Sequence, residues 1–189
     1  GMVDNILSNV TFNTLVVRFS EALDPVSATS PALFQLVEAG PNGTPGDGDD
    51  VVVSIASMTY TAGDVDVRLT FLGQVPQGLY RLTLVSGAID AIVDQAGNAL
   101  DGDVNGTVTG NFVRNFRLDL TPPTIVSVTP NGAVGPGPTQ FVVAFAENLL
   151  LNAGTVTSAT NYLLFASADD VFGNGDDTNE SARITGITY

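Results

Sequence analysis

Apolar and polar residues alternate with a period of two along much of this chain, which is the pattern of half-buried β-strands. The clearest runs are residues 14–19, 34–36, 65–71, 80–84 and 112–118. Nowhere do apolar residues recur at a spacing of three to four over three turns, and residues 24–32 could hold one helical turn at most. The pattern therefore predicts short strands and almost no helix.

A further extended run, residues 51–60, changes phase partway along. One phase holds Val51, Val53 and Ile55, and the other holds Met58 and Tyr60. A single extra residue in a strand turns the following side chains to the opposite face. We therefore predict a β-bulge near Ser57.

Two parts of the chain repeat each other. Residues 15–23 return as residues 141–149, and the acidic residues 46–50 return as residues 173–177, at separations of 126 and 127 positions. Such a period is far above the roughly 20 to 50 residues of solenoid repeats and indicates tandem domains with separate cores. We place the first domain at residues 1–120 and a second at residues 121–189, after the proline-containing linker.

The strands of the first domain fit one architecture. Seven or so short strands in about 115 residues, separated by clusters of Gly, Pro, Asn and Asp, predict an all-β, immunoglobulin-like antiparallel β-sandwich. The Trp and paired Cys of antibody domains are absent. Tyr80 has the position of a tyrosine corner, whose hydroxyl bonds to upstream backbone, and an ordinary core tyrosine is the alternative. In either case we expect Tyr80 to be structural.

The second domain is a partial β-sandwich. It has no counterparts of residues 65–71, 80–84 and 112–118. Because a sandwich needs both sheets to bury their inner faces, half of this core would stay uncovered. We expect residues 121–189 to be the N-terminal half of a repeat cut from a longer protein. The alternative is that another copy supplies the missing strands, which would give a strand-swapped or edge-paired dimer.

Composition excludes several classes of function. The chain has 20 acidic and 6 basic residues, so its formal net charge of -14 disfavours nucleic acid and anionic lipid and favours cations. The absence of Cys and His excludes disulfides, the usual zinc sites, cysteine nucleophiles and histidine-based triads. No apolar run approaches the roughly 18 residues of a membrane span, so we expect no membrane insertion. The chain opens on no signal-peptide pattern, and Gly1 resembles a residue left by cloning, so an export signal would lie outside it.

Several short motifs of the first domain occur together in one family. They are Phe19–Asp24, Ser27–Thr29, Phe34–Leu36, Gly46–Asp50, Gly78–Leu82 and Asp94–Gly102. As a set they resemble the bacterial Ig-like domains found in tandem in large secreted and surface proteins. The resemblance covers residues 10–118 and, from Thr121, the first half of a second copy, which departs in having Leu150 where the first has Asp24. It implies an extracellular or cell-surface spacer, adhesion or surface-layer module without catalysis, beside neighbouring Ig-like domains of the same protein.

Residues 101–106 read D-x-D-x-N-G, the spacing that opens a calcium loop. The oxygen-bearing candidates are Asp101, Asp103 and Asn105, with Asp94 and Asn98 nearby in sequence. The twelfth position is Phe112 rather than a glutamate, which excludes a complete EF-hand. A calcium site of another kind remains open, and so does a plain turn, because Asp, Asn and Gly favour turns without any metal.

The second candidate calcium site is the acidic segment that both repeats contain. Its members are Asp47, Asp49 and Asp50 in the first repeat and Asn174, Asp176 and Asp177 in the second, with Asp169 and Asp170 nearby. Carboxylates crowded on one loop repel each other unless water, salt or a cation offsets their charge, and calcium prefers oxygen ligands of this kind. The alternative is a solvated hairpin that keeps a sheet edge soluble.

We do not expect catalysis. Glu21 and Asp24 could form a carboxylate pair, but Glu21 recurs as Glu147 at the end of an equivalent strand, which indicates a local structural role. Two functions compete: a stiff spacer, whose interdomain geometry is set by the prolines of residues 120–123, and a recognition module. The recognition module would hold a surface polysaccharide or another protein through end loops or an exposed sheet edge. Most Phe and Tyr lie in the inward phase, which favours the spacer.

Overall fold

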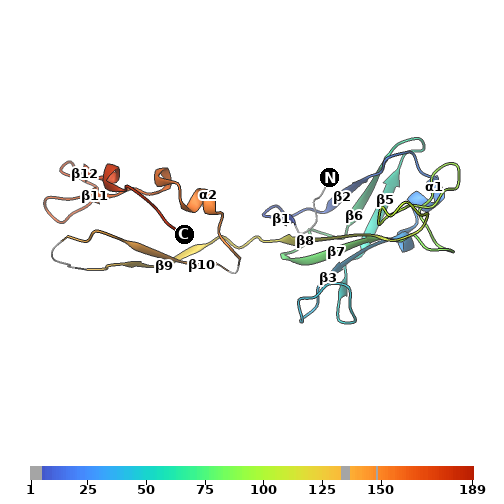
Figure 1. Ribbon diagram of the computed structural model, residues 1–189, viewed down its shortest axis with the longest axis horizontal. Coiled ribbons are helices and arrows are strands. Elements are labelled where there is room, and N and C mark those ends of the chain that lie inside the picture. The colour runs from blue at the N-terminus through green and yellow to red at the C-terminus, as the bar shows by residue number, and fades with distance from the viewer. Residues whose placement is uncertain (1–5, 133–136, 148) are drawn as a thin grey trace. The chain divides into compact units, whose positions relative to one another are not determined.

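The computed structural model describes residues 6–132, 137–147 and 149–189. The chain divides into two compact units, residues 1–120 (unit 1) and residues 121–189 (unit 2). Each unit has its own sheets, and the labels of Figure 1 are used for their strands and helices.

Unit 1 is a sandwich of two sheets. One has five strands in the order β1-β8-β7-β3-β4, and the other has three in the order β2-β6-β5. The strands are β1 (Ile6–Ser8), β2 (Thr14–Arg18), β3 (Phe34–Glu38), β4 (Val51–Val52), β5 (Ile55–Tyr60), β6 (Asp66–Phe71), β7 (Gly78–Leu84) and β8 (Phe112–Leu118). All pairs are antiparallel except β1 with β8, which is parallel. This arrangement confirms the all-β, immunoglobulin-like prediction.

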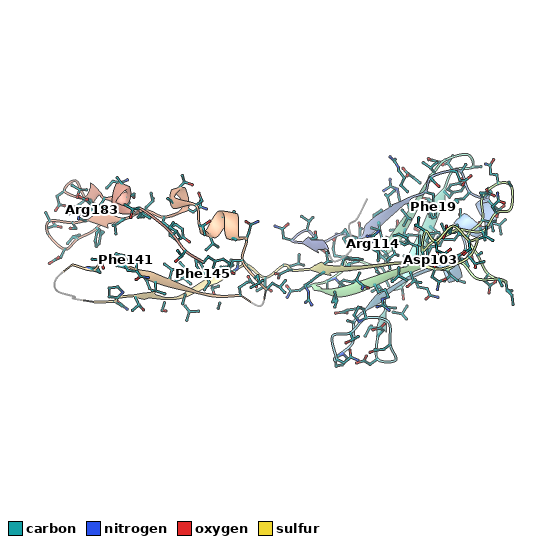
Figure 2. All side chains as sticks on the ribbon, viewed as in Figure 1. Phe19, Asp103, Arg114, Phe141, Phe145 and Arg183 are labelled. Atoms are coloured by element: carbon teal, nitrogen blue, oxygen red, sulfur yellow. The ribbon has the colours of Figure 1, made fainter. Side chains whose placement is uncertain are left out.

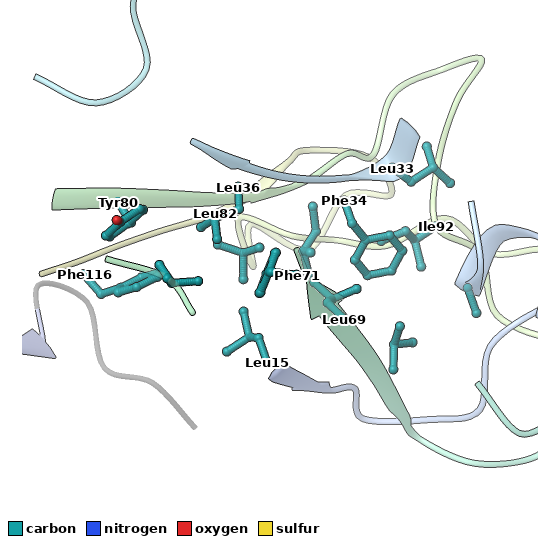
Figure 3. Packing of buried hydrophobic residues seen from close by; sticks show 14 of the residues in the cluster. Leu15, Leu33, Phe34, Leu36, Leu69, Phe71, Tyr80, Leu82, Ile92 and Phe116 are labelled. Carbon is teal, nitrogen blue, oxygen red and sulfur yellow. The ribbon is translucent and has the colours of Figure 1, made fainter. Parts of the chain in front are cut away.

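The alternation in the sequence decides which side chains enter the core. In β6, Val67, Leu69 and Phe71 are buried, whereas Arg68 between them is exposed. In β7, Tyr80, Leu82 and Leu84 are buried in the same way. Because β6 and β7 belong to opposite sheets, their apolar faces meet at the centre of the sandwich, as Figure 3 shows.

The run of residues 51–60 is not one strand, as its extended pattern suggested, but two strands in different sheets. β4 pairs with β3, whereas β5 pairs with β6. Between them the Val53 N–H still donates to the Leu36 carbonyl at 2.9 Å, so the chain leaves the first sheet at Ser54. The predicted bulge is confirmed, because the β5–β6 register shifts between Ile55 and Ser57.

Tyr80 forms a tyrosine corner. Its hydroxyl donates to the Pro76 carbonyl at 2.8 Å, four residues upstream, and its ring stacks on Phe116 with centroids 5.4 Å apart. The side chain is fully buried, and burial raises the pKa of Tyr80 to about 12. The corner therefore fixes the connection between β6 and β7, the point where the chain crosses from one sheet to the other.

Helical structure is confined to single turns. In unit 1, α1 (Pro25–Ala28) is capped by Asp24, whose Oδ2 accepts from the Ser27 N–H at 2.9 Å. A 3-10 turn, η1 (Pro31–Leu33), follows it and leads into β3. The sequence predicted at most one helical turn in residues 24–32. The structure has two single turns there, α1 and η1. No helix among the described residues is long and apolar enough to cross a bilayer.

The described residues of unit 2 form two two-stranded sheets and no closed core. β9 (Thr124–Thr129) pairs with β10 (Val142–Ala146), and β11 (Phe165–Ala166) pairs with β12 (Thr178–Asn179), both antiparallel. The helical turns are α2 (Ala153–Val156), η2 (Ala159–Asn161) and η3 (Ser181–Arg183). Not one of the described residues of this unit is buried.

The helical turns of the two units correspond at an offset of 128, because α2 and η2 begin 128 residues after α1 and η1. Asn152 caps α2, its Oδ1 accepting from the Thr155 N–H at 3.2 Å, as Asp24 caps α1. The match of Asp24 with Leu150 was therefore wrong. Two extra residues after Glu147 move the capping residue to Asn152, and a side-chain cap is retained in both units.

We expect Tyr80→Phe to lower the stability of unit 1 by about 1 kcal/mol, since it removes the hydrogen bond from the buried Tyr80 hydroxyl to the Pro76 carbonyl. Urea unfolding followed by circular dichroism would measure the change. Tyr162→Phe is the control, because it removes a hydroxyl–carbonyl bond to Val156 in unit 2 and should leave the unit 1 transition in place. An unchanged unit 1 midpoint in Tyr80→Phe would contradict the structural role of the corner.

Candidate cation sites in the acidic loops

The structure brings three of the predicted ligands together in the loop that joins β3 to β4, here named acidic loop 1 (residues 39–50). One carboxylate oxygen from each of Asp47, Asp49 and Asp50 lies within 4.8 Å of the others. Calcium–oxygen distances are about 2.3–2.6 Å, so two ligands on opposite sides of one ion lie roughly 4.8 Å apart. The three side chains could thus contact one ion with little movement.

Hydrogen bonds to nearby donors fold acidic loop 1. The Gly46 N–H donates to Asp50 Oδ2 at 2.5 Å, and the Asn42 side-chain amide donates to Asp47 Oδ2 at 2.8 Å. Gly46 has a φ of 102°, and a β-carbon there would overlap Nη1 of Arg81 on β7. A glycine is therefore required, and the Arg81 guanidinium lies against the loop.

The charges in acidic loop 1 are not equivalent. Hydrogen bonds from the Asp49 carboxyl and the Asn42 amide lower the pKa of Asp47, and the nearby Arg81 charge acts in the same direction. The pKa of Asp49 is raised, chiefly because its carboxyl shares a hydrogen bond with Asp47. As pH falls, Asp49 is therefore protonated before Asp47.

One carboxylate oxygen of acidic loop 1 accepts no hydrogen bond from the described residues. Asp50 Oδ1 is shielded from solvent and has no hydrogen-bond partner among the described residues. A shielded carboxylate oxygen without a partner is unfavourable unless water or an ion satisfies it. Its presence beside Asp47 and Asp49 fits a cation ligand.

Unit 2 folds its acidic segment in the same way, between β11 and β12 (acidic loop 2, residues 167–177). The Gly173 N–H donates to Asp177 Oδ2 at 2.6 Å, as the Gly46 N–H does to Asp50. Asp177 Oδ1, like Asp50 Oδ1, is shielded and has no partner among the described residues. The arrangement therefore recurs at an offset of 127, although the metal-sized cluster of three acidic groups was found in acidic loop 1 alone among the residues described.

An exchange of Asn and Asp preserves one contact in both loops. In acidic loop 1 the Asn42 amide donates to Asp47, whereas in acidic loop 2 the Asn174 amide donates to Asp169 at 3.0 Å. Position 42 corresponds to 169 and position 47 to 174, so the two residue types have changed places. Each loop keeps one amide–carboxylate pair, although acidic loop 2 has four aspartates where acidic loop 1 has three. Sequence reasoning missed the role of Asn42, and the Asn–Gly dipeptide after Pro41 was the available signal.

Asp94 and Asn98 lie together in the long connection between β7 and β8, where they close a turn. Asp94 Oδ1 accepts from the Ala96 and Asn98 N–H groups, each at 2.8 Å, and Oδ2 accepts from the Asn98 amide at 2.7 Å. The Asn98 side chain and the backbone N–H groups of the turn lower the pKa of Asp94. The carboxylate is therefore already satisfied by its own turn.

Asp101, Asp103 and Asn105 also lie together, and their contacts are again local. Asp101 accepts from the Gly106 N–H at 2.9 Å and the Asn105 N–H at 3.1 Å, and these bonds lower its pKa. The Asn105 amide donates to Asp103 at 2.8 Å. These contacts are those of the plain-turn alternative, in which Asp and Asn side chains bond to nearby backbone.

A surface hollow of about 220 Å³ collects residues from both ends of unit 1's sequence. Its polar lining comes from Ser20, Glu21, Asp94, Asn98 and Asp101. Figure 2 labels Phe19 and Asp103 near this end of the unit. Sequence reasoning did not bring Glu21 to this end, because Asp94 and Asp101 lie 73 and 80 residues further along the chain and give no local signal.

Comparisons with known proteins add little to this geometry. No family model and no curated protein matches the chain. A solved structure of PcoC, a copper resistance protein from Escherichia coli, is similar with a TM-score of 0.41 and 15% identity, over 61% of this chain and 90% of that one. A likeness this weak carries no argument about a metal or a function.

We expect the loop carboxyls to titrate on both sides of the usual aspartate pKa of about 3.9. Asp94 and Asp101 should titrate below it, and Asp49 above it. The stabilisation from Asp94 and Asp101 is present above the unfolded-state pKa and is lost as pH falls through their lowered folded-state pKa. For Asp49 the sign reverses: its contribution is present at low pH and is lost as pH rises through its raised folded-state pKa.

Side-chain ¹³C chemical shifts followed against pH by NMR would measure these values. Asn98→Ala should return the pKa of Asp94 toward the usual value and leave that of Asp101 unchanged. An Asp94 that titrates at or above the usual value would contradict its role as the acceptor of the turn.

Proposed function

We propose that this chain is a non-catalytic structural module of a bacterial surface or secreted protein, a spacer whose acidic loops bind calcium and become rigid. The single observation that carries the proposal is the recurrence of acidic loop 1 as acidic loop 2. Both have a glycine N–H bonded to the last aspartate and a shielded, unpartnered oxygen on that aspartate. A cation at this place would tie β3 to β4, and β11 to β12, at the base of each hairpin.

The donor set favours calcium over softer metals. Asp47, Asp49 and Asp50 supply carboxylate oxygens, and the chain has neither Cys nor His. Hard cations such as calcium take oxygen ligands and tolerate irregular geometry, whereas copper and zinc prefer sulfur and imidazole nitrogen. Asp94 and Asp101 are the weaker candidate ligands, because their carboxylate oxygens already accept hydrogen bonds from backbone N–H groups of their own turns.

Of the carboxylate pair weighed for catalysis, Asp24 has a structural contact, and so does Glu147, the counterpart of Glu21. Asp24 caps α1, and Glu147 Oε1 accepts from the Leu149 N–H at 3.3 Å. The closed core of unit 1 gives a stiff body, which is what a spacer requires. These contacts support a module whose contribution is mechanical rather than chemical.

One observation favours the second candidate function, recognition of a surface polysaccharide or protein. A hollow of about 470 Å³ lies beside α1, between Asp24 and the residues that follow β7. Val26 and Ile89 border it and are 78% and 95% exposed. Loops at one end of a sandwich commonly carry binding sites, and these two apolar side chains are where such a site would lie.

We expect millimolar calcium to raise the melting temperature, by about 5 °C at ten times the dissociation constant, because calcium binds the folded loops and not the unfolded chain. Differential scanning calorimetry with calcium and then chelator would measure the shift. The variant Asp50→Asn with Asp177→Asn removes the last aspartate of both loops and should abolish most of it.

Asp90→Asn is the control for loss of an aspartate charge, since it removes one carboxylate, against two in the test variant, at an exposed site outside both acidic loops. Calcium should shift its melting temperature as in the wild type. A melting temperature that neither calcium nor chelator moves would refute calcium binding. The closed core of unit 1 would then be the remaining support for the proposed spacer role.

A further inference from the structure

Asparagine followed directly by glycine occurs four times in this chain. The pairs are Asn42–Gly43, Asn105–Gly106, Asn131–Gly132 and Asn174–Gly175. In such a pair the backbone nitrogen of the glycine can attack the side-chain carbon Cγ of the asparagine, because glycine has no β-carbon to hinder the approach. The attack requires the asparagine side chain to turn its Cγ toward that nitrogen. Hydrogen bonds that restrain the side chain or engage the nitrogen therefore decide which pairs react.

The asparagine of acidic loop 1 is restrained on both side-chain atoms. Asn42 Nδ2 donates to Asp47 Oδ2 at 2.8 Å, and Asn42 Oδ1 accepts from the Thr44 N–H at 2.6 Å. The Gly43 N–H donates to the Gly40 carbonyl at 2.9 Å. Rotation of the side chain would break the first two bonds, and the third engages the nitrogen that would attack. We therefore expect this pair to be protected.

The pair in the turn of residues 101–106 is restrained in the same three ways. Asn105 Nδ2 donates to Asp103 Oδ2 at 2.8 Å, and Asn105 Oδ1 accepts from the Thr107 N–H at 2.8 Å. The Gly106 N–H donates to Asp101 Oδ2 at 2.9 Å. The turn that satisfies these aspartates thus also protects the asparagine.

The pair in acidic loop 2 has weaker restraints. Asn174 Nδ2 donates to Asp169 Oδ2 at 3.0 Å, but Asn174 Oδ1 accepts from the Asp176 N–H at 3.4 Å, which is a long bond. The Gly175 N–H has no partner among the described residues. One restraint of normal length remains, so this pair should be intermediate.

The fourth pair has none of these restraints. Asn131 and Gly132 lie just after β9, in the connection to β10 (Figure 1), and both are exposed. Neither the Asn131 side chain nor the Gly132 N–H has a hydrogen-bond partner among the described residues. Gly132 has a φ of 85°, and a β-carbon there would meet no atom within 4 Å. The space around the pair is open, so the side chain is able to turn.

We propose that Asn131 is a site of spontaneous covalent modification, which converts it to aspartate and isoaspartate, whereas hydrogen bonds protect the other three pairs. The Gly132 nitrogen loses its proton to hydroxide and bonds to Asn131 Cγ. The Cγ–Nδ2 bond breaks, and the leaving nitrogen takes a proton from water and departs as ammonia. Water then adds to either carbonyl of the resulting succinimide and opens the ring. The net reaction exchanges ammonia for water, with no oxidation or reduction.

The modification changes charge and, in one product, the main chain. Both products carry a carboxylate where the amide stood, so the chain becomes more acidic. Isoaspartate also routes the main chain through the former side chain and adds a methylene just after β9, whose Thr129 pairs with Val142. Because the addition lies outside the ladder in an exposed connection, the ladder should tolerate it.

Mass spectrometry of the full chain, incubated in mildly alkaline buffer, tests the assignment. The chain has no lysine, so trypsin places Asn42 in peptide 19–68 and Asn105 in peptide 82–114. Peptide 118–183 carries both Asn131 and Asn174, which fragmentation distinguishes. We expect Asn131 to convert about tenfold faster than Asn42 or Asn105, the factor that one or two ordinary hydrogen bonds supply. Equal rates in the folded chain would overturn the proposal.

Unfolding the chain in guanidinium chloride is the control for local sequence. Without the turns, all four asparagines should convert at similar rates, because each is followed by glycine. If Asn131 kept its lead over Asn42 and Asn105 in the unfolded chain, the fold would not be the cause, and the proposed protection would be wrong. A chain digested without incubation gives the background.

Two glycine variants provide a matched pair. Gly132→Ala places a β-carbon beside the attacking nitrogen and should slow the conversion of Asn131 about tenfold. Gly137→Ala is the control in the same connection, since an added β-carbon meets no atom within 4 Å at either position. It should leave the rate unchanged. An unaltered rate in Gly132→Ala would exclude the succinimide route.

Protection can be removed at one of the other pairs. Asp101→Ala releases the Gly106 N–H, and Asp103→Ala releases the Asn105 amide. Each should speed the conversion of Asn105 and leave that of Asn42 unchanged, provided that circular dichroism shows the folded spectrum. Conversion of Asn105 at the original rate in both folded variants would refute protection by these bonds.

Discussion

The structure depends on one constraint: an amphipathic sheet is stable only when a second sheet covers its apolar face. In unit 1, β6 and β7 follow each other in the chain yet lie in opposite sheets, so the connection between them joins the two halves of the core. The Tyr80 corner holds that connection by a bond from a buried hydroxyl to the Pro76 carbonyl. The described residues of unit 2 follow the same early course and contain no counterparts of β6 and β7. Its apolar residues are correspondingly exposed, and its two small sheets have open edges.

The acidic residues form two groups, which differ in whether a carboxylate oxygen is left without a hydrogen-bond partner once the local turn has formed. Asp94 and Asp101 direct their oxygens to backbone N–H groups of their own turns, so forming the turn already stabilises the charge. Asp50 and Asp177 each bond to one glycine N–H and leave the other oxygen shielded and unused. A carboxylate that folds a turn and a carboxylate that keeps an unpartnered oxygen have the same sequence signature. They differ in the geometry of their neighbours, which is why acidic loop 1 is a better candidate than residues 101–106.

Comparison of the two units shows which details the architecture tolerates. Two extra residues before α2 shift the cap from an aspartate to Asn152, and the cap survives because either side chain can accept the N–H bond. In the acidic loops the amide and the carboxylate of one pair have exchanged positions, and the contact persists. Arg81, in contrast, has no counterpart beside acidic loop 2 in the described residues. The surroundings of the two acidic loops therefore differ, although the loops fold alike.

The sequence by itself determined the strands, their inward faces and the bulge near Ser57, because alternation with a period of two is a local property that burial then respects. It also determined which residues are chemically able to bind a cation. It could not show that residues 51–60 divide between two sheets, that Arg81 lies against Gly46, or that Glu21 borders the same hollow as Asp94. Those relations join residues that are distant in the chain, and no local pattern encodes them. Only the tertiary structure decided them, because the packing of one sheet on the other sets which loops meet and which oxygens remain free.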